Sequence, residues 1–453
     1  MADLFFARAL LPSGWARDVR IGVDVGRIAS IEIGAPARPG DERHAIGIPG
    51  MPNLHSHAFQ RGMAGLAEIR GATADSFWTW REVMYRFVGR MTPDDIEAVA
   101  AQAYVEMLEA GFTRVGEFHY IHHDVSGAPY GNLAELGERI AAATATSGIG
   151  LTLLPVFYAH AGFGGQTPNE GQRRFINDID GYARLLDASR RAVADLPGAV
   201  VGVAPHSLRA AMPDELTAVV DLGKEGPIHI HIAEQAREVD DCMAWSGQRP
   251  IDWLMDHAEV DRRWCLIHAT HATPNEIRRM ALGGAVAGLC PVTEANLGDG
   301  TFSAPDFIGQ GGTFGIGTDS NVLIGVSDEL RQLEYSQRLA RQMRNAVTSE
   351  ATPSTGRTLF DHALKGGAQA LGVAAVGLVE GASADIVALD HDNAALAARA
   401  GDAILDSWIF AARRSAVDAV WVRGRKLVQD GRHHAGEAIA QRFHATLQRL
   451  LRQ

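Results

Sequence analysis

The sequence predicts a (β/α)₈ barrel with a small β-sandwich domain that both ends of the chain build together. The middle of the chain alternates short apolar segments with amphipathic stretches of helical period, a pattern typical of parallel βα units. Such units follow one another over about 300 residues, which fits a closed barrel of about 250 residues with insertions. Strand-like segments at both chain ends flank these units. A doubly wound sheet is the structural alternative, but polar residues at the ends of the predicted strands favour the closed barrel.

The two chain ends are predicted to form one domain because both contain short apolar strands separated by turns. The N-terminal strands are predicted at 4–10, 18–25 and 27–33, and the C-terminal strands at 385–389, 416–423 and 424–428. We therefore expect residues 1–47 and 376–453, with a terminal helix, to form the β-sandwich domain. Residues 48–375 are then the barrel.

The barrel strands are predicted where apolar runs of strand length precede helical stretches. These strands are 48–55, 113–119, 150–157, 199–205, 227–233, 264–269, 285–290 and 313–318. Helices are predicted at 93–109, 173–194, 213–224 and 327–345. The longest inserted loops, 71–91 and 160–172, are expected at the face where the strands end.

Composition and charge narrow the class of protein. The net charge of −12 argues against nucleic acid as the main partner. No apolar run approaches the ~20 residues of a membrane span, and the first residues lack the basic region of a signal peptide. The cysteines, Cys242, Cys265 and Cys290, are far apart, which does not suggest a disulfide framework. We therefore expect a cytoplasmic protein.

The first predicted barrel strand ends in a His-x-His pattern. Side chains alternate faces along a strand, so His55 and His57 project from the same face. Two imidazoles on a rigid strand suit a divalent metal such as zinc. The alternative for this pair alone is two ordinary surface or core histidines.

Polar residues also end three other predicted strands. His231 and Glu234 end the fifth strand, His268 ends the sixth and Asp319 ends the eighth. Barrels of this kind carry their active sites at the C-terminal ends of the strands. One such residue is more often structural, but four strand ends in register indicate a site. His229, one layer below His231, is expected to be a core histidine.

This pattern resembles the amidohydrolase superfamily, specifically its mononuclear metal-dependent deaminase branch. The resemblance implies that His55, His57, His231 and Asp319 bind the metal. Glu234 matches the His-x-x-Glu motif of the branch, and His268 matches its strand-6 histidine. Members with two metals bridge them with a lysine at a strand end, and this chain has none there, so one metal per subunit is expected. Zinc is the expected ion, with iron and manganese as alternatives.

Four sequence strings resemble the formimidoylglutamate deiminases more closely. These strings are 49–61, 77–82, 117–123 and 290–300. The resemblance implies hydrolysis of N-formimidoyl-L-glutamate to N-formyl-L-glutamate and ammonia, a step of histidine degradation, by a homodimer. Metal-activated hydroxide is expected to attack the formimidoyl carbon, with Asp319 accepting a proton from the water and Glu234 passing one to the departing nitrogen. His268 either shuttles a proton or orients Asp319.

Recognition of a glutamate moiety requires positive charge at the same end of the barrel as the expected metal ligands. Arg209 directly follows the fourth strand and Arg81 lies in the 71–91 loop beside two tryptophans, and arginine forks bind carboxylates well. Which arginine meets which carboxylate stays open. By the resemblance, Gln60, Tyr120 and His206 are further substrate-binding candidates, and the 71–91 loop is a candidate lid.

Two other functions compete with this interpretation. A related deaminase acting on guanine or another purine needs amide and aromatic contacts rather than two arginines. A non-catalytic barrel serving as a scaffold typically loses its metal ligands, whereas His55, His57, His231 and Asp319 are all present.

Overall fold

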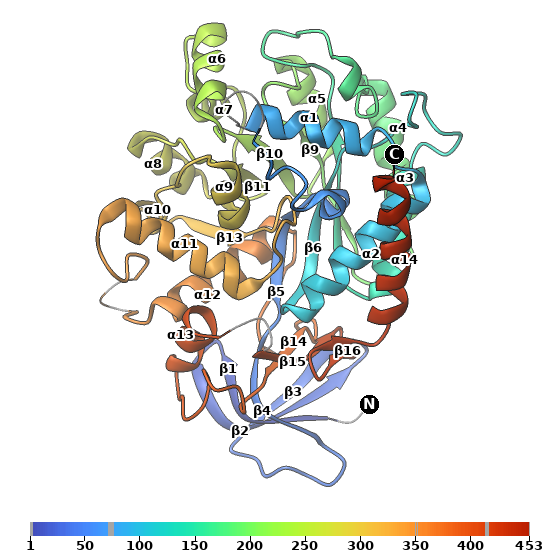
Figure 1. Cartoon of the computed structure of the whole chain (residues 1–453). Helices are drawn as coiled ribbons and strands as arrows, with labels where there is room; N and C mark the ends of the chain where they lie inside the picture. Colours follow the sequence, from blue (N-terminus) through green and yellow to red (C-terminus); the bar gives the residue numbers. More distant parts are fainter. Residues whose placement is uncertain (1–2, 71–76, 349, 351, 413–415, 453) are drawn as a thin grey trace.

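The computed structural model describes residues 3–70, 77–348, 350, 352–412 and 416–452. At its centre, parallel strands form a ring with helices around it (Figure 1). The ring strands are β5 (Met51–Ser56), β6 (Phe112–His119), β7 (Gly150–Phe157), β8 (Val200–Val201), β9 (Ala204–Pro205), β10 (Ile228–Ile232), β11 (Trp264–His268), β12 (Val286–Leu289) and β13 (Thr313–Ile316). The predicted (β/α)₈ barrel is therefore confirmed, and each predicted barrel strand overlaps one position of the ring.

Backbone bridges close the ring between two hydrogen-bonded sheets. One sheet runs β5-β6-β7-β8, with β9 also paired to β7, and the other runs β10-β11-β12-β13. The bridge from Ser56 to Asp319 joins β5 to the end of β13, and the bridge from Val203 to Ile228 joins the fourth position to β10. The predicted strand 199–205 forms as two short pieces, β8 and β9, which share one position of the ring.

Helices pack around the barrel and across its open end, and several begin at side-chain caps. They are α1 (Phe77–Val88), α2 (Pro93–Glu109), α3 (Glu135–Ser147), α4 (Ile179–Ala192), α5 (Pro213–Leu222), α6 (Ala236–Ser246), α7 (Pro250–His257), α8 (Pro274–Gly283), α9 (Pro291–Leu297), α10 (Ala304–Gly309), α11 (Val326–Arg341), α12 (Thr355–Ala370), α13 (Ala403–Phe410) and α14 (Gly436–Leu451). In α2, Thr92 and Asp95 form a capping box and Pro93 occupies the first turn. No helix of the described residues is long and apolar enough to cross a membrane.

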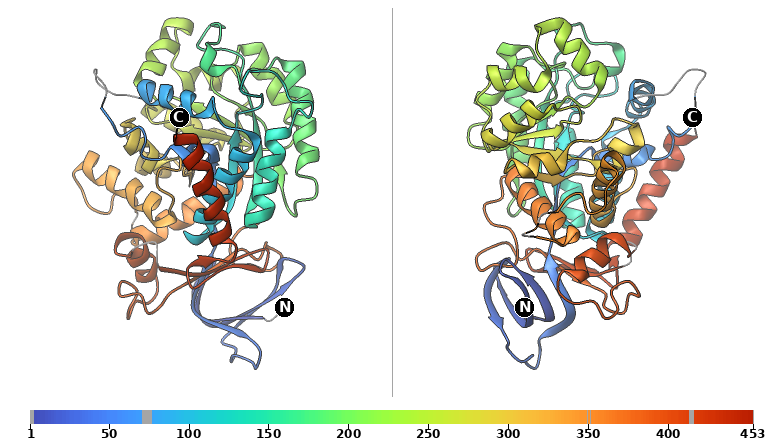
Figure 2. Two further views of the ribbon diagram at one scale, coloured as in Figure 1. Left: turned by 45° about the vertical axis from the view of Figure 1, so that its right-hand side comes forward. Right: turned by 90° about the vertical axis from the view of Figure 1, so that its left-hand side faces the viewer.

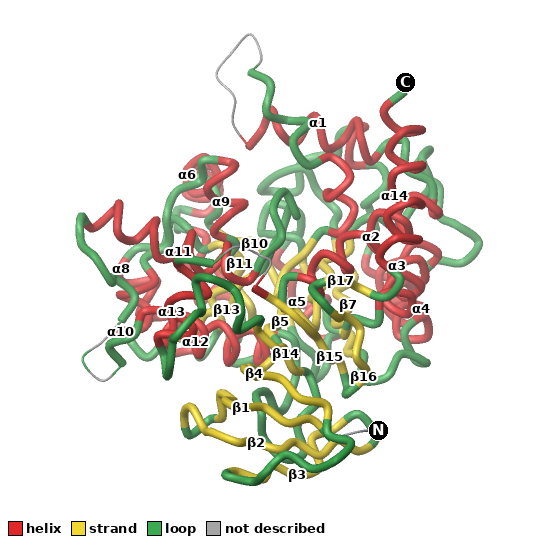
Figure 3. The backbone as a smooth tube through the Cα atoms, turned by 60° about the horizontal axis from the view of Figure 1, so that its bottom comes forward, coloured by secondary structure: helices red, strands yellow, loops and turns green. Residues whose placement is uncertain are grey.

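The two chain ends build one small β-domain below the barrel, as predicted (Figure 2). Its hydrogen bonds form a single eight-stranded sheet in the order β17-β16-β15-β14-β4-β1-β2-β3. The strands are β1 (Leu4–Leu11), β2 (Gly14–Asp24), β3 (Arg27–Ile33), β4 (Glu42–Pro49), β14 (Ile386–Leu389), β15 (Val417–Val422), β16 (Arg425–Gln429) and β17 (Arg432–His433). Strand β4 joins the ends because it pairs with β1 on one side and β14 on the other (Figure 3).

The strand predicted at 48–55 divides between the two domains. Strand β4 ends at Pro49 in the small sheet and β5 begins at Met51 in the barrel. Gly50 between them passes so close to Thr113 that an added Cβ would lie 2.3 Å from its side chain. The small sheet is therefore connected to the first barrel strand by a single residue.

The region predicted as the loop 71–91 contains a helix. Residues 71–76 lie outside the described part, but 77–88 form α1, which lies across the open end of the barrel (Figure 1). Its buried residues, Met84, Tyr85, Phe87 and Val88, recur at helical spacing. The clustered aromatic residues of this segment concealed that period in the sequence.

The terminal helix α14 packs on α2 of the barrel rather than on the small sheet (Figure 2). Arg442 forms an ion pair of 2.5 Å with Glu97, and Arg449 forms another with Asp95. The last segment of the chain therefore returns from the small domain to the barrel.

Candidate active site

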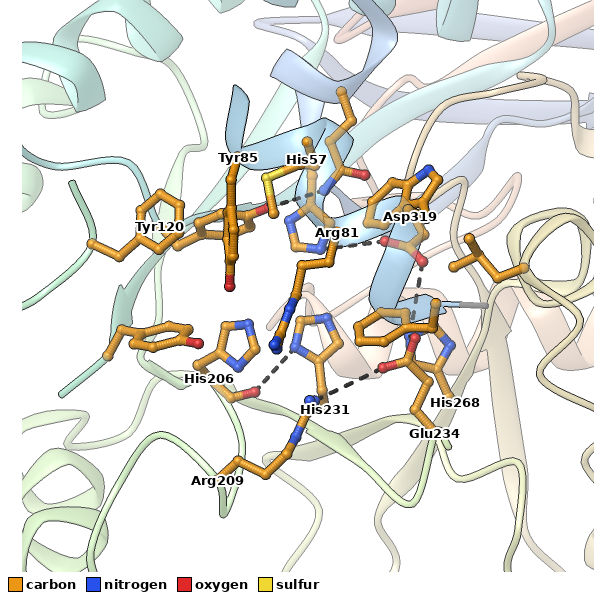
Figure 4. Close-up of a pocket in the computed structure, with 17 residues that line it drawn as sticks. His57, Arg81, Tyr85, Tyr120, His206, Arg209, His231, Glu234, His268 and Asp319 are labelled. Atoms are coloured by element: carbon orange, nitrogen blue, oxygen red, sulfur yellow. Dashed lines mark hydrogen bonds and ion pairs between the residues drawn. The ribbon is translucent and has the colours of Figure 1, made fainter. Parts of the chain in front are cut away.

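A pocket opens at the C-terminal ends of the barrel strands, and the predicted site residues converge on it. Its walls include His57, Gln60, Arg81, Tyr120, His206, Arg209, His231, Glu234, His268 and Asp319 (Figure 4). The remaining predicted ligand, His55, is fully buried beside His57 and His231. Segments far apart in the chain thus supply one cavity, as the closed ring requires.

Four potential metal donors meet at the pocket floor. The Nε2 atoms of His55 and His231 lie 3.1 Å apart, and Asp319 Oδ1 lies 3.3 Å from His57 Nε2 and 3.5 Å from His55 Nε2. His57 Nδ1 donates to the Phe118 carbonyl and His231 Nδ1 donates to the His206 carbonyl, each at 3.0 Å. These bonds leave the Nε2 lone pairs of both rings pointing at the centre of the cluster. Three imidazoles and one carboxylate so arranged fit a divalent cation.

Burial keeps this donor set in the protonation state that a cation needs. Burial lowers the pKa of His55 to about 3 and also lowers the pKa of His57 and His231, so these rings are neutral. Burial alone would raise the pKa of Asp319, but the neighbouring histidines hold it below its usual value. The cluster therefore offers neutral imidazoles and an ionised carboxylate.

A hydrogen-bond network positions Asp319 and His57. Asn321 Nδ2 donates to Ser56 Oγ and to the carbonyls of His57 and Asp319, each at 3.1 Å. The backbone of Asp319 adopts a left-handed φ of 44°, which costs energy in a non-glycine residue. Thr318 Oγ1 donates to Asn321 Oδ1 at 2.6 Å and so locks the amide in this orientation. The network therefore holds the strained turn at Asp319 against the end of β5.

Glu234 and His268 lie between the donor cluster and the open part of the pocket. His268 Nε2 lies 3.9 Å from Glu234 Oε1 and 3.8 Å from Asp319 Oδ2. Burial raises the pKa of Glu234, although His268 and Arg209 oppose the rise. Burial lowers the pKa of His268, but Glu234, Glu294 and Asp319 together raise it to about 10. This triad can hold and exchange protons within one enclosed site.

Two carboxylates outside the pocket form hydrogen bonds that orient His268 and the backbone of Glu234. Glu294, in the first turn of α9, accepts from His268 Nδ1 at 3.2 Å and from the Cys290 amide at 2.9 Å. Glu238, in the first turn of α6, accepts from the amides of Ala233 and Glu234. Both lie on helices that directly follow barrel strands, so each fixes the turn at its strand end.

Arg81 and Arg209 point into the same pocket from opposite sides (Figure 4). Arg209 is 8% exposed, and its Nη2 lies 4.0 Å from Glu234 Oε2. Burial opposes its charge, but Glu238 and Glu234 raise the pKa of Arg209 above its usual value. The guanidinium of Arg81 stacks over the Trp78 ring at 4.6 Å. Two cations therefore line the same pocket as the metal-donor cluster.

Polar and aromatic side chains complete the walls. Gln60 Nε2 donates to Tyr120 Oη at 2.9 Å, and its buried Oε1 has no partner among the described residues. Burial raises the pKa of Tyr120 and Tyr85, so their hydroxyls stay protonated. Burial lowers the pKa of His206, which is therefore neutral. These groups offer directional hydrogen bonds in a cavity screened from water.

Sequence reasoning missed several pocket residues. Phe77, Met84 and Tyr85 reach the pocket from α1, beside Trp80, which was expected near Arg81, and Tyr158, Phe175 and Leu297 reach it from loops after β7 and from α9. A helical period over 77–88 was the available indication for the α1 residues. His229 lies below the site with its Nε2 donating to the Ala370 carbonyl at 2.7 Å, in agreement with its expected place in the core.

Family models match nearly the whole chain. The model of the amidohydrolase family matches residues 46–427, and a model described as the N-terminal domain of formimidoylglutamate deiminase HutF matches residues 1–45. The boundary between them falls in β4, where the small sheet leads into the barrel.

Individual relatives agree with these models. A formimidoylglutamate deiminase of Pseudomonas aeruginosa is 53% identical over all of both chains, and a 5-methylthioadenosine/S-adenosylhomocysteine deaminase of Natronomonas pharaonis is 28% identical over 91% of this chain and 88% of its own. The crystal structure of an amidohydrolase from Brucella melitensis superposes with a TM-score of 0.97 at 59% identity, covering all of both chains. A zinc-bound adenosine deaminase of Xanthomonas campestris, 21% identical, shares the fold with a TM-score of 0.82 over 100% of this chain and 99% of its own. The chain therefore belongs to the amidohydrolase family and, within it, to the formimidoylglutamate deiminases.

Proposed function

We propose that the protein hydrolyses N-formimidoyl-L-glutamate to N-formyl-L-glutamate and ammonia, as a step of histidine degradation. The observation that carries the proposal is the pairing of Arg81 and Arg209 with an acid–base triad and a metal-donor cluster in one pocket. The substrate has an amidine-like carbon on its α-nitrogen and two carboxylates, one on the neighbouring α-carbon and one at the far end of the side chain. A pocket that combines two cations with a hydrolytic centre matches these groups.

His55, His57, His231 and Asp319 would hold one divalent metal, which we propose to be zinc. A bound divalent cation lowers the pKa of a water molecule towards ~7 and so supplies hydroxide at neutral pH. The neutral state of the three imidazoles supports this assignment, because protonated rings cannot ligate.

Asp319, His268 and Glu234 would move the protons of the reaction. Asp319 takes the proton of the attacking water. Its Oδ2 lies 3.8 Å from His268 Nε2, so the imidazole interacts with the charge of this carboxylate. Glu234 donates a proton to the terminal nitrogen, so that ammonia leaves the tetrahedral adduct and the formyl amide remains. General acid–base catalysis of this kind contributes about 10²–10⁴-fold. The raised pKa of Glu234 suits a group that must carry a proton.

Arg81 and Arg209 would bind the two carboxylates of the glutamate moiety. Charge-assisted bonds from a guanidinium to a carboxylate are strong and geometrically specific. Gln60, Tyr120 and His206 would add hydrogen bonds to the substrate, since the side-chain oxygen of Gln60 is buried without a partner in the described part of the chain and the Tyr120 hydroxyl is protonated. The aromatic rings of α1 would exclude water once the substrate is bound.

The first experiment is ammonia release by the purified, zinc-loaded protein. N-Formimidoyl-L-glutamate, N-formimidoyl-L-aspartate and guanine are offered separately. Fast turnover of the glutamate derivative alone is the expected result. Turnover of guanine, or of none of the three, would contradict the proposed substrate and leave the metal-donor cluster to be explained by other chemistry.

Three broader expectations belong to the same proposal. We propose the division into 1–47, 48–375 and 376–453, a homodimer, and a cytoplasmic location. Cys242, Cys265 and Cys290 are buried free thiols, which suits a reducing compartment. Light scattering after size-exclusion chromatography measures the assembly, and a monomer's mass would contradict the dimer.

A further inference from the structure

A fully buried arginine, Arg174, lies outside the pocket and has no part in the chemistry described above. Its side chain is 1% exposed, in the segment that follows the 3₁₀ turn η2 (Glu170–Gln172). Burying a guanidinium is costly unless its donors are bonded. Its bonds go to main-chain carbonyls: Nε to His123 at 2.9 Å, and Nη1 to Val88 at 2.6 Å and Met91 at 3.0 Å.

Two of these acceptors mark the C-terminal end of α1. Val88 is the last residue of the helix, and Met91 closes the turn that follows it. Carbonyls at a helix C-terminus lack partners within the helix and carry partial negative charge, so a cation there is favourable. Arg174 therefore binds the end of α1 by both charge and hydrogen bonds.

The main chain of Arg174 forms hydrogen bonds with the barrel, so this residue connects the end of α1 to it. Its carbonyl accepts the amides of His122 and His123, at 2.9 Å and 3.0 Å, in the loop after β6. The next residue, Phe175, lines the pocket and contacts the rings of Tyr85 and Tyr120, with centroid distances of 6.1 Å and 4.9 Å. Arg174 thus contacts both the end of α1 and the loop after β6, and its neighbour Phe175 belongs to the pocket wall.

Helix α1 brings Arg81 and Tyr85 to the pocket. The helix lies across the open end of the barrel, so its placement decides where these two side chains point (Figure 1, Figure 4). We propose that Arg174 is a positioning residue for substrate recognition. It holds α1 at the angle from which Arg81 reaches the substrate, without contacting the substrate itself. The inference rests on the proposed function of this pocket.

The neighbouring Arg173 provides a matched control. Its side chain is 31% exposed, bonds the Val125 carbonyl at 2.8 Å and pairs with Glu170 at 3.1 Å, so these bonds do not go to the carbonyls at the end of α1. The variants compared are Arg174→Met, Arg174→Lys and Arg173→Met. Lysine keeps the charge but loses the planar fork, so Arg174→Lys should show a weaker form of the same effect and is a milder substitution for folding.

The first readout needs no substrate. Hydrogen exchange followed by mass spectrometry should show amides of 77–91 exchanging about tenfold faster in Arg174→Met than in the natural protein, with the barrel strands unchanged. Arg173→Met should exchange like the natural protein. Unchanged exchange over 77–91, or an increase of equal size across the barrel, would overturn the proposal.

The second readout is steady-state kinetics. For Arg174→Met, the KM for N-formimidoyl-L-glutamate should rise about tenfold while kcat stays within about twofold, because recognition and not chemistry is disturbed. A fall in kcat at unchanged KM would contradict a positioning role towards Arg81. If even the natural protein fails to turn over this substrate, the proposed function is wrong, and the exchange result still decides whether Arg174 holds α1.

Discussion

Burial decides the protonation state of each side chain at the pocket floor. Removing His55, His57 and His231 from water lowers their pKa values, whereas the same burial raises the pKa of Glu234. The site therefore combines neutral imidazoles with a carboxyl group that can carry a proton. One physical cause thus suits these residues to both proposed roles, metal binding and acid catalysis.

Glu234→Gln tests the assigned proton donor. Glutamine has nearly the same shape but cannot donate an acidic proton, so kcat for ammonia release should fall by about 10²–10⁴-fold. KM and metal content, the latter measured by atomic emission, should stay close to those of the natural protein. A rate near that of the natural protein would remove Glu234 from the mechanism.

Glu294→Gln tests how His268 is oriented. The carboxylate accepts from His268 Nδ1 at 3.2 Å, and removing its charge should lower kcat by about 10–100-fold with little change in KM. Glu329→Gln is the matched control, because this glutamate is also buried and bonds the Val292 amide of the same helix α9. Burial raises the pKa of Glu329, so glutamine should replace its neutral form at little cost. Equal losses in both variants would indicate a general effect of disturbing α9.

Arg81→Met tests carboxylate recognition. Loss of a charge-assisted bond to substrate should raise KM by about 10–100-fold in ammonia-release kinetics. Arg237 also stacks over Trp78, at 4.8 Å, but its side chain is 65% exposed, so Arg237→Met is the control. If the two variants have the same KM, Arg81 has no special part in binding.

At the residue scale, the sequence reveals those site residues that end strands. His55 and His57 were predicted together because side chains alternate along a strand, and His231, His268 and Asp319 were added because each lies at the end of another predicted barrel strand. Glu294, Glu238 and Tyr85 were not predicted, because their contribution depends on distances between elements that no periodicity encodes. The roles of all these residues stay predictions.

Among the elements, strands and capped helices were predicted best. The stretch 93–109 was predicted as a helix and is α2, since Thr92, Pro93 and Asp95 specify its start. Helix α1 was predicted as a loop, because its residues pack on the pocket and the carbonyl at its end accepts from Arg174, and these contacts are distant in the sequence. A helix defined by such contacts is harder to predict than the regular units of the barrel.

His433 provides a pH-dependent link between elements. Its Nε2 donates to the Ser147 carbonyl at the end of α3, and its Nδ1 accepts the Ala435 amide at the start of α14. Burial lowers the pKa of His433, so the folded state binds the proton less readily than the unfolded state does. Its contribution to stability is therefore fully present above the unfolded pKa of about 6.5 and is lost as pH falls below that value.

Thermal unfolding between pH 5 and 8 measures this link. The natural protein should lose stability below pH 6.5, with a slope from this group of at most about 1.4 kcal/mol per pH unit. The variant His433→Gln should lose less over the same range, because its amide does not titrate. His444→Gln, on the exposed side of α14, should follow the natural protein. Identical pH profiles for all three proteins would contradict the assignment.

For the whole molecule, the barrel and the small sheet are expected to unfold together. Strand β4 leads into β5 through Gly50 alone, whose amide donates to the Asp385 carbonyl of the C-terminal segment at 3.0 Å. Helix α14 then returns to the barrel and pairs Arg442 with Glu97. The chain thus crosses between the two parts near both ends, and neither part can open without breaking contacts of the other.

Scanning calorimetry with and without zinc tests this coupling. One transition is expected, and zinc at 100 times its dissociation constant should stabilise the native state by about 2.7 kcal/mol, because the four donors meet only in the folded barrel. The whole transition should therefore move to higher temperature. Two transitions, of which zinc moves only one, would show that the sheet built by the chain ends is an independent folding unit. In that case the single-residue connection at Gly50 joins the two parts without transmitting stability between them.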